Sequence, residues 1–219
     1  MNTWVARVLD LFFPRRCVGC GMAGSHCCAI CRTTLPRAAR WHTPALILFE
    51  YHDARVRRLI WLLKYRGARD IAQTFAAVLY EEVISELAER QSYRPGERGP
   101  WLVVPVPLAP SRLKKRGFNQ AAEIAKHLVR HNTGVFELAT DLLCKTRDTA
   151  SQVSRGTRAA RLDNLHEAFA LNPQATVTPH GRNIILLDDV MTTGATLSEG
   201  TRALADAGAA HILPVAIAG

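Results

Sequence analysis

The stretch Ile184-Ile185-Leu186-Leu187-Asp188-Asp189-Val190-Met191-Thr192-Thr193-Gly194-Ala195-Thr196 decides the fold of this chain. Its four leading apolar residues predict a strand that is buried on both faces, as in parallel sheets. Two carboxylates and a loop of hydroxyls and glycine follow, and then a helix pattern that stops at Gly208. This order predicts an α/β protein whose parallel sheet is flanked by helices.

The loop predicts a site for a phosphorylated polyol. The backbone N–H groups of Thr193, Gly194 and Ala195 would point at an anion near the positive end of the helix dipole. Asp188 and Asp189 can accept hydrogen bonds from two vicinal hydroxyls of a 5-phosphorylated ribose. An acidic pair alone is as typical of a magnesium site or a helix cap, but the complete run is more specific.

That run resembles, position for position, the phosphoribosyl pyrophosphate (PRPP) loop of type I phosphoribosyltransferases. The shared pattern is four apolar residues, two acids, two apolar residues, two small hydroxylic residues, a small residue, any residue and a hydroxyl. The resemblance implies that the loop binds PRPP, accompanied by Mg²⁺. The residues implied to bind PRPP are Asp188, Asp189, Val190, Met191, Thr192, Thr193, Gly194, Ala195 and Thr196.

Charge is unevenly distributed along the 219 residues. The chain has 28 Lys and Arg against 19 Asp and Glu, a net charge of +9, and residues 1–161 alone carry 26 basic and 13 acidic residues. This excess predicts a polyanionic partner, either single-stranded DNA or phosphorylated small molecules, with a merely solvated surface as the alternative. The basic DNA-binding candidates are Arg15, Arg16, Lys114, Lys115 and Arg116, and the aromatic residues that could stack on bases or simply fill the core are Trp41, Tyr51, Trp61, Tyr65 and Phe118.

Two Cys-x-x-Cys pairs, Cys17 with Cys20 and Cys28 with Cys31, are separated by seven residues. In a cytosolic chain this spacing predicts one tetrahedral structural zinc, and a disulfide or redox pair is the alternative. Gly21 follows the second cysteine, where a tight knuckle favours a residue without Cβ. The adjacent residues His26 and Cys27 could substitute as ligands, whereas Cys144 is expected to be a small core residue.

The organisation predicted is a small N-terminal module, residues 1–44, followed by a phosphoribosyltransferase-like domain, residues 45–219. The module starts with a helix whose apolar face includes Trp4, Val8 and Phe12 and which lacks the order of a signal peptide. No apolar run reaches the length of a membrane span, so a cytoplasmic protein is expected. The polar stretch 145–164, which contains Arg147, predicts a mobile lid, with an ordinary exposed loop or polar helix as the alternative.

Further elements are predicted along the chain. Strands are expected near residues 46–51, 101–106, 169–171 and 211–217, with the prolines near 105 marking the end or an edge of a strand. Helices are expected after Asp53, over about 70–90, and from Asn119 to about residue 131, with Asp53 and Asn119 as caps. Residues 112–116 are expected to form a basic turn.

A narrower resemblance rests on the order of motifs. A cysteine knuckle after Phe-Pro, Lys-Tyr-x-Gly at residue 64, Pro-Val-Pro-Leu before Arg-Gly-Phe-Asn-Gln, a Thr-x-x-Gln loop and Asp-Asp-x-x-Thr-Thr-Gly together resemble the ComF family, which includes ComFC and GntX relatives. The likeness covers essentially the whole chain. One departure is the interval from Gln152 to Arg161, which is one residue longer than usual.

The ComF resemblance implies a zinc-finger region and a type I phosphoribosyltransferase-like core. It also implies a role in natural transformation or use of imported DNA, with competence helicase or DNA-processing partners. Lys64, Arg112, Arg116 and Arg147 would then lie toward the pyrophosphate or the lid. The function expected is PRPP binding by a protein that handles single-stranded DNA. The alternative is an active phosphoribosyltransferase that transfers phosphoribose to a nucleobase-like or amine acceptor, although no general base or base-recognition hood can be identified.

Overall fold

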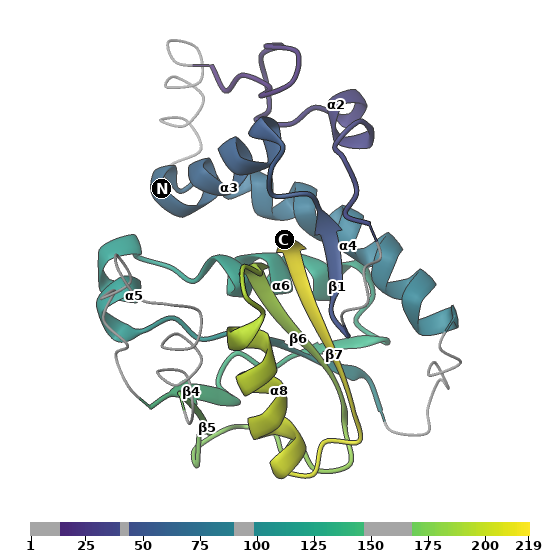
Figure 1. Cartoon of the computed structure of the whole chain (residues 1–219), viewed down its shortest axis with the longest axis vertical. Coiled ribbons are helices and arrows are strands. Elements are labelled where there is room, and N and C mark those ends of the chain that lie inside the picture. The colour runs from purple at the N-terminus through teal and green to yellow at the C-terminus, as the bar shows by residue number, and fades with distance from the viewer. Residues whose placement is uncertain (1–13, 40–43, 90–98, 147–167) are drawn as a thin grey trace.

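The computed structural model describes residues 14–39, 44–89, 99–146 and 168–219 of the chain. Their centre is a five-stranded parallel sheet with the strand order β1-β7-β6-β2-β3. Figure 1 shows β7 beside β6 in this sheet. A second sheet pairs β4 with β5 antiparallel. The strands are β1 (Leu46–Phe49), β2 (Trp101–Pro105), β3 (Phe136–Leu138), β4 (Leu143–Lys145), β5 (Phe169–Leu171), β6 (Asn183–Val190) and β7 (His211–Ala218).

Helices cover both faces of the main sheet. One face packs against α3, α4 and α6, and the other against α8 and the β4–β5 pair. The predicted α/β class is therefore confirmed. The helices among the described residues are α2 (Ala29–Thr33), α3 (Ala54–Arg66), α4 (Asp70–Glu89), α5 (Pro110–Arg116), α6 (Gln120–His131) and α8 (Ala195–Asp206).

Strand β6 contains the apolar run that precedes the two acids. Ile185 and Leu187 face the core beneath α3, α4 and α6, whereas Ile184 and Leu186 face the core beneath α8. Both faces of the strand are thus removed from water, so no polar alternation is possible until the acids begin. Gly200 of α8 lies where a Cβ would meet the Leu186 Cδ2 atom at 2.9 Å, which allows the helix to pack closely on this strand.

Local sequence signals set the starts of the helices beside the sheet. The Asp53 carboxylate accepts hydrogen bonds from the N–H groups of Arg55 and Val56 at the start of α3. The Asn119 side chain accepts from the Ala122 N–H at the start of α6. Both predicted caps are confirmed, because each side-chain oxygen satisfies an N–H that has no partner within its helix.

Three details differ from the sequence expectations or extend them. Residues 110–116 form the short helix α5 rather than a turn, with Pro110 at its first position and Gly117 in the left-handed region, at φ 78°, at its end. Pro105 ends β2 as expected, but β2 is an inner strand between β6 and β3. Cys144 is half-buried in β4 and its thiol lies near the backbone oxygens of β5.

The cysteine-rich segment packs on α3 and α4 (Figure 1). Cys27 and Leu35 are buried in the same core as these helices, and Arg37 pairs with Phe49 of β1 through an isolated bridge. The predicted N-terminal helix and residues 147–164 of the predicted lid lie outside the described residues. The domain boundary near residue 44 stays a prediction. Within the described part of the chain, no helix is long and apolar enough to cross a membrane.

Candidate functional site

The loop between β6 and α8 has the backbone that an anion site needs. Gly194 precedes the helix with φ 76°, in the left-handed region that L side chains avoid. A Cβ there would meet only the Met191 side chain, with the Sδ atom at 3.6 Å, so backbone conformation and not space requires the glycine. Within the described residues, the N–H groups of Thr192, Thr193 and Gly194 have no hydrogen-bond acceptor. The Ala195 N–H, which was expected to point at the anion, instead donates to the Thr193 Oγ1 atom at 3.4 Å. The N–H groups of Thr192, Thr193 and Gly194 lie at the N-terminal end of a 12-residue helix, where an anion is stabilised.

The two carboxylates stand at the carboxyl end of β6 and differ in their environment. The Lys64 ammonium lies 2.9 Å from the Asp189 Oδ1 atom, and both side chains are less than one-fifth exposed. The Asp189 N–H donates to the Asp188 Oδ1 atom at 2.8 Å. Burial, and then repulsion from Asp189, raise the pKa of Asp188 to about 7. The single positive charge of Lys64 therefore does not balance the two carboxylates, and a further cation beside them would be stabilised.

A cleft of about 280 Å³ joins the acidic pair to the helix N-terminus and to several cations. Six parts of the fold line it: the residue Tyr51 after β1, the end of α3, the segment from the end of β2 to the start of α6, the paired ends of β4 and β5, the end of β6, and the loop into α8. The cationic side chains that line it are Lys64, Arg112, Arg116 and Lys145. Carboxylates, hydroxyls and cations thus surround one open volume, which suits a small ligand that carries both hydroxyls and phosphates.

The structure separates the sequence candidates into two groups. Arg112 and Arg116 line the cleft as the predicted pyrophosphate candidates, and Arg116 also donates to the Gln120 side chain at 2.9 Å. Lys64, which was expected to lie toward the pyrophosphate or the lid, forms an ion pair with Asp189 of the acidic pair. Lys114 and Lys115 are exposed on α5 and outside the cleft. Arg147 lies outside the described residues.

The other two DNA candidates lie near the cysteine module. Arg15 and Arg16 line a shallow hollow of about 470 Å³ together with Arg58 of α3. The Arg16 guanidinium also contacts the Gly21 carbonyl oxygen at 3.4 Å. These arginines therefore belong to a surface apart from the cleft, and their contact with DNA stays a prediction.

Sequence reasoning missed several residues of the cleft. Lys145 ends β4 and lies over the Phe169 ring, with its ammonium 5.7 Å from the ring centroid. Tyr51 follows β1 and Asn119 caps α6, and both line the same cleft. For Lys145, its place at the start of the polar stretch 145–164 was a signal in the sequence. Tyr51 and Asn119 could be placed at the cleft only from the strand order, which brings the end of β1 and the start of α6 to the same edge of the sheet as the end of β6.

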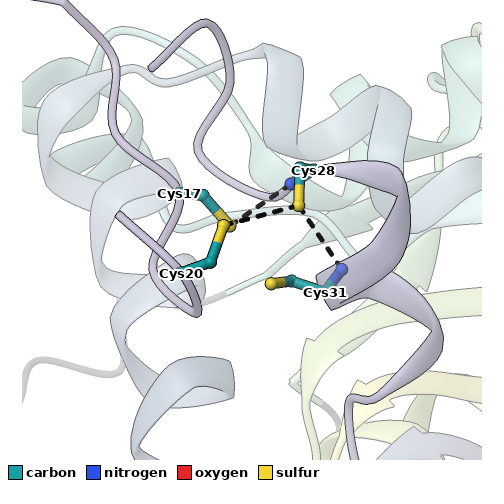
Figure 2. A group of neighbouring side chains, drawn as sticks. All are labelled: Cys17, Cys20, Cys28 and Cys31. Carbon is teal, nitrogen blue, oxygen red and sulfur yellow. Dashed lines mark hydrogen bonds between the residues drawn. The ribbon is translucent and has the colours of Figure 1, made fainter. Parts of the chain in front are cut away.

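The four predicted zinc ligands come together (Figure 2). The sulfur atoms of Cys17, Cys20, Cys28 and Cys31 all lie within 4.8 Å of one another. The Cys20 and Cys28 sulfurs are 3.8 Å apart, which equals the edge of a tetrahedron whose centre is about 2.3 Å from each sulfur. None of the described cysteines forms a disulfide. The set is a four-cysteine cluster compatible with structural zinc.

The surroundings of the cluster also fit a metal. Gly19 lies where a Cβ would meet the Cys31 sulfur at 2.7 Å, so the knuckle closes only around a glycine. Gly21 is needed for another reason, its φ of 75°, because a Cβ there would meet nothing. The Cys28 N–H donates to the Cys17 sulfur at 3.4 Å, as backbone amides do around zinc thiolates. Gly19 was not singled out from the sequence, since only the folded knuckle reveals the contact.

The two alternative ligands have other partners. The His26 ring Nδ1 lies 2.9 Å from the Asp70 carboxylate, and the His26 N–H donates to it as well. Cys27 is buried in the core, and burial raises the pKa of its thiol to about 11. Neither joins the four-cysteine cluster. The arrangement links the cysteine module to the first residue of α4 instead.

Comparison with known proteins places these features in context. The family described as "Phosphoribosyl transferase domain" matches residues 113–218. The DNA utilization protein YhgH of Escherichia coli K12 is 30% identical over 196 residues, which cover 90% of this chain and 80% of that protein. Competence protein F of Haemophilus influenzae is 29% identical over 198 residues, which cover 90% of this chain and 81% of that protein. Among solved structures, hypoxanthine phosphoribosyl transferase of Trypanosoma cruzi is 14% identical, covering 68% of this chain and 64% of that one, with a TM-score of 0.41.

Proposed function

Because this chain belongs to the ComF family, with competence protein F and the DNA utilization protein among its relatives, we propose that it binds PRPP and acts in the handling of imported single-stranded DNA. The single observation that carries the first half of this proposal is the cleft at the carboxyl end of β6. It combines two carboxylates, the hydroxyls of Thr192 and Thr196, and four cationic side chains around about 280 Å³.

Each part of the cleft supports one part of the ligand. Asp188 and Asp189 are proposed to accept hydrogen bonds from the two ribose hydroxyls. The loop Thr192–Thr196 is proposed to bind the 5-phosphate through N–H groups at the start of α8, where the helix dipole favours an anion. Arg112 and Arg116 are proposed to pair with the diphosphate, since a guanidinium suits phosphate oxygens in bidentate contacts.

The residues also fit Mg²⁺ as a partner of PRPP. Burial and the charge of Asp189 raise the pKa of Asp188 and so disfavour its charged form. A bound divalent cation would stabilise that charged form. Asp188 and Asp189 would hold the ion together with oxygens of the ligand, and Mg²⁺ would neutralise part of the diphosphate charge. Lys64, which now pairs with Asp189, would then be released toward the diphosphate.

Calorimetric titration with PRPP and Mg²⁺ tests this assignment. Wild-type protein is expected to bind, and the double variant Asp188→Asn with Asp189→Asn is expected to lose binding while it keeps its fold by circular dichroism. Lys115→Ala serves as the matched control, because Lys115 is exposed and does not line the cleft. Unchanged affinity in the double variant would show that the acidic pair does not contact the ligand.

The second half of the proposal concerns DNA. Family membership and the basic charge of residues 1–161 support it. Lys114 and Lys115 on α5, and Arg15 and Arg16 beside the cysteine module, are the basic residues proposed to contact the DNA backbone. Such contacts position a strand but do not select its sequence. Binding should therefore weaken with salt, with a logarithmic slope of about −0.7 for each phosphate contacted.

A second candidate function is transfer of the phosphoribosyl group from PRPP to a small acceptor. One observation favours it: a carboxyl group whose pKa is about 7 can exchange a proton near neutral pH, as acid–base catalysts do. In that reaction the bond from the anomeric carbon to the diphosphate breaks, and the acceptor's electron pair forms the new bond. Release of pyrophosphate from PRPP, measured with and without single-stranded DNA, separates turnover from binding alone.

A further inference from the structure

The outward face of α3 carries two aromatic rings that the core does not use. Trp61 is 38% exposed and Tyr65 is 56% exposed. They are four residues apart, so they are neighbours on one side of the helix, and their ring centroids lie 5.9 Å apart. Of the five aromatic residues that the sequence suggested for stacking, Tyr51 and Phe118 instead pack against the core. Trp41 lies outside the described residues.

Positive charge surrounds this pair of rings. The Arg58 guanidinium carbon lies 4.7 Å from the centroid of the Trp61 ring, and that of Arg66 lies 5.7 Å from it. On the other side, the Arg116 guanidinium carbon lies 5.5 Å from the Tyr65 centroid. Helices α3 and α5 together contain nine basic residues, and neither helix contains an acidic residue. The surroundings of the two rings are therefore basic, which favours an anionic partner over an apolar one.

The face of α3 that carries Trp61 and Tyr65 lies next to the cleft. Lys64 is next to Tyr65 in the sequence but turns inward to Asp189. Arg116 contacts the Tyr65 ring and also lines the cleft. The exposed face of α3 thus ends at the rim of the proposed PRPP site, and Arg116 belongs to both.

We propose that Trp61 and Tyr65 form a stacking platform for the bases of single-stranded DNA, with Arg58 and Arg66 contacting its backbone, and that the strand continues past Arg116 toward the cleft. This inference rests on the proposed DNA handling and names its surface. Unpaired bases offer flat faces of any sequence to aromatic rings, whereas the bases of a duplex stack on each other. The absence of acids on α3 and α5 disfavours a mixed-charge protein interface and suits a phosphate backbone.

The experiment compares four proteins and two oligonucleotides by fluorescence anisotropy, using the full chain. The proteins are wild type, Trp61→Ala with Tyr65→Ala, Trp61→Phe with Tyr65→Phe, and Arg58→Gln with Arg66→Gln. The oligonucleotides are labelled oligothymidine and an abasic strand of equal length, which keeps the phosphates but has no bases. We expect the double alanine variant to bind oligothymidine about tenfold or more weakly, since stacking on each ring contributes measurably. The phenylalanine variant should retain most of the affinity.

The abasic strand separates stacking from charge. Wild-type protein should bind it as weakly as the alanine variant binds oligothymidine, and the alanine variant should bind it with nearly the same affinity as wild type does. The salt slope of the alanine variant should match that of wild type, whereas Arg58→Gln with Arg66→Gln should reduce it by about 0.7 for each phosphate that the variant no longer binds. Both aromatic variants should still bind PRPP, because neither ring lines the cleft.

The outcomes distinguish this inference from the proposed function. Wild-type affinity in the alanine variant would overturn the platform but leave DNA handling in place, with a protein partner as the occupant of the α3 face. Equal losses for both oligonucleotides would also overturn it, because the bases would then not be what the rings contact. If wild type binds PRPP but no single-stranded DNA, the platform and the DNA half of the proposed function both fail. If it binds DNA at the rings but not PRPP, only the cleft assignment fails.

Discussion

Asp188→Asn should stabilise the free protein while it weakens binding of PRPP. In the folded chain, burial and the Asp189 charge raise the pKa of Asp188 from 3.8 to about 7. In the unfolded chain the same group titrates near 4. Between these two values the unfolded state loses its proton and the folded state keeps it. Stability conferred by this residue is therefore fully present below pH ~4 and is lost as the pH rises to about 7.

The magnitude follows from the size of that difference. A pKa difference of about 3 corresponds to roughly 4 kcal/mol at pH 8 as an upper bound, and about 1–3 kcal/mol is expected because the side chain is only partly removed from water. Asparagine carries no charge at any pH, and its side-chain oxygen can still accept the Asp189 N–H that now lies 2.8 Å from Asp188. The substitution should therefore remove this penalty without removing the hydrogen bond.

Urea unfolding followed by circular dichroism at several pH values from about 5 to 8 measures the effect. The difference in unfolding free energy between Asp188→Asn and wild type should grow as the pH rises. Asp141→Asn is the matched control of opposite sign, because hydrogen bonds from Thr176 lower the pKa of Asp141 and its charge stabilises the fold. A gain at Asp188 that does not change with pH, or a loss at pH 8, would refute the reasoning.

Three other variants probe the rest of the molecule. One zinc per chain is expected by elemental analysis, and Cys17→Ser should lower it and destabilise the module, because zinc binding contributes to folding. Gly19→Ala should weaken zinc binding with all four ligands present, measured by chelator competition, since its Cβ would lie 2.7 Å from the Cys31 sulfur. Asn119→Ala should cost about 1–2 kcal/mol of unfolding free energy, measured by urea unfolding, because both a helix cap and a bond to the Val106 oxygen are removed.

The sequence sufficed where short-range chemistry determines the outcome. The buried strand, its acidic end and the glycine before α8 all lie within one continuous segment, and each has a local cause. The same holds for the four-cysteine cluster, where the two-residue spacing places Cys28 rather than Cys27 with the first pair. Capping by Asn119 was also predictable, because a cap needs only the residues of its own turn.

Features that depend on distant segments were out of reach. The ion pair of Lys64 with Asp189 joins α3 to β6, and periodicity on α3 gives no reason for one lysine to turn inward. The raised pKa of Asp188 needs the burial that the whole cleft provides. Strands β3 and β4 were missed because each has three residues of which one is charged, whereas the three residues of β5 are all apolar. The basic segment forms helix α5 because Pro110 and Gly117 bound it.

The place of β7 between β1 and β6 has a consequence for how the chain folds. Its residues pair with a strand far upstream, Leu46 with Val215, as well as with the neighbouring β6. During synthesis, β6 must therefore wait with one open edge, and β1 without a strand partner, until residues 211–218 are available. Contacts at such separation slow folding, and open strand edges favour aggregation in the meantime. Truncation before β7 would not trim an edge of the sheet but divide it, leaving β1 without any strand to pair with.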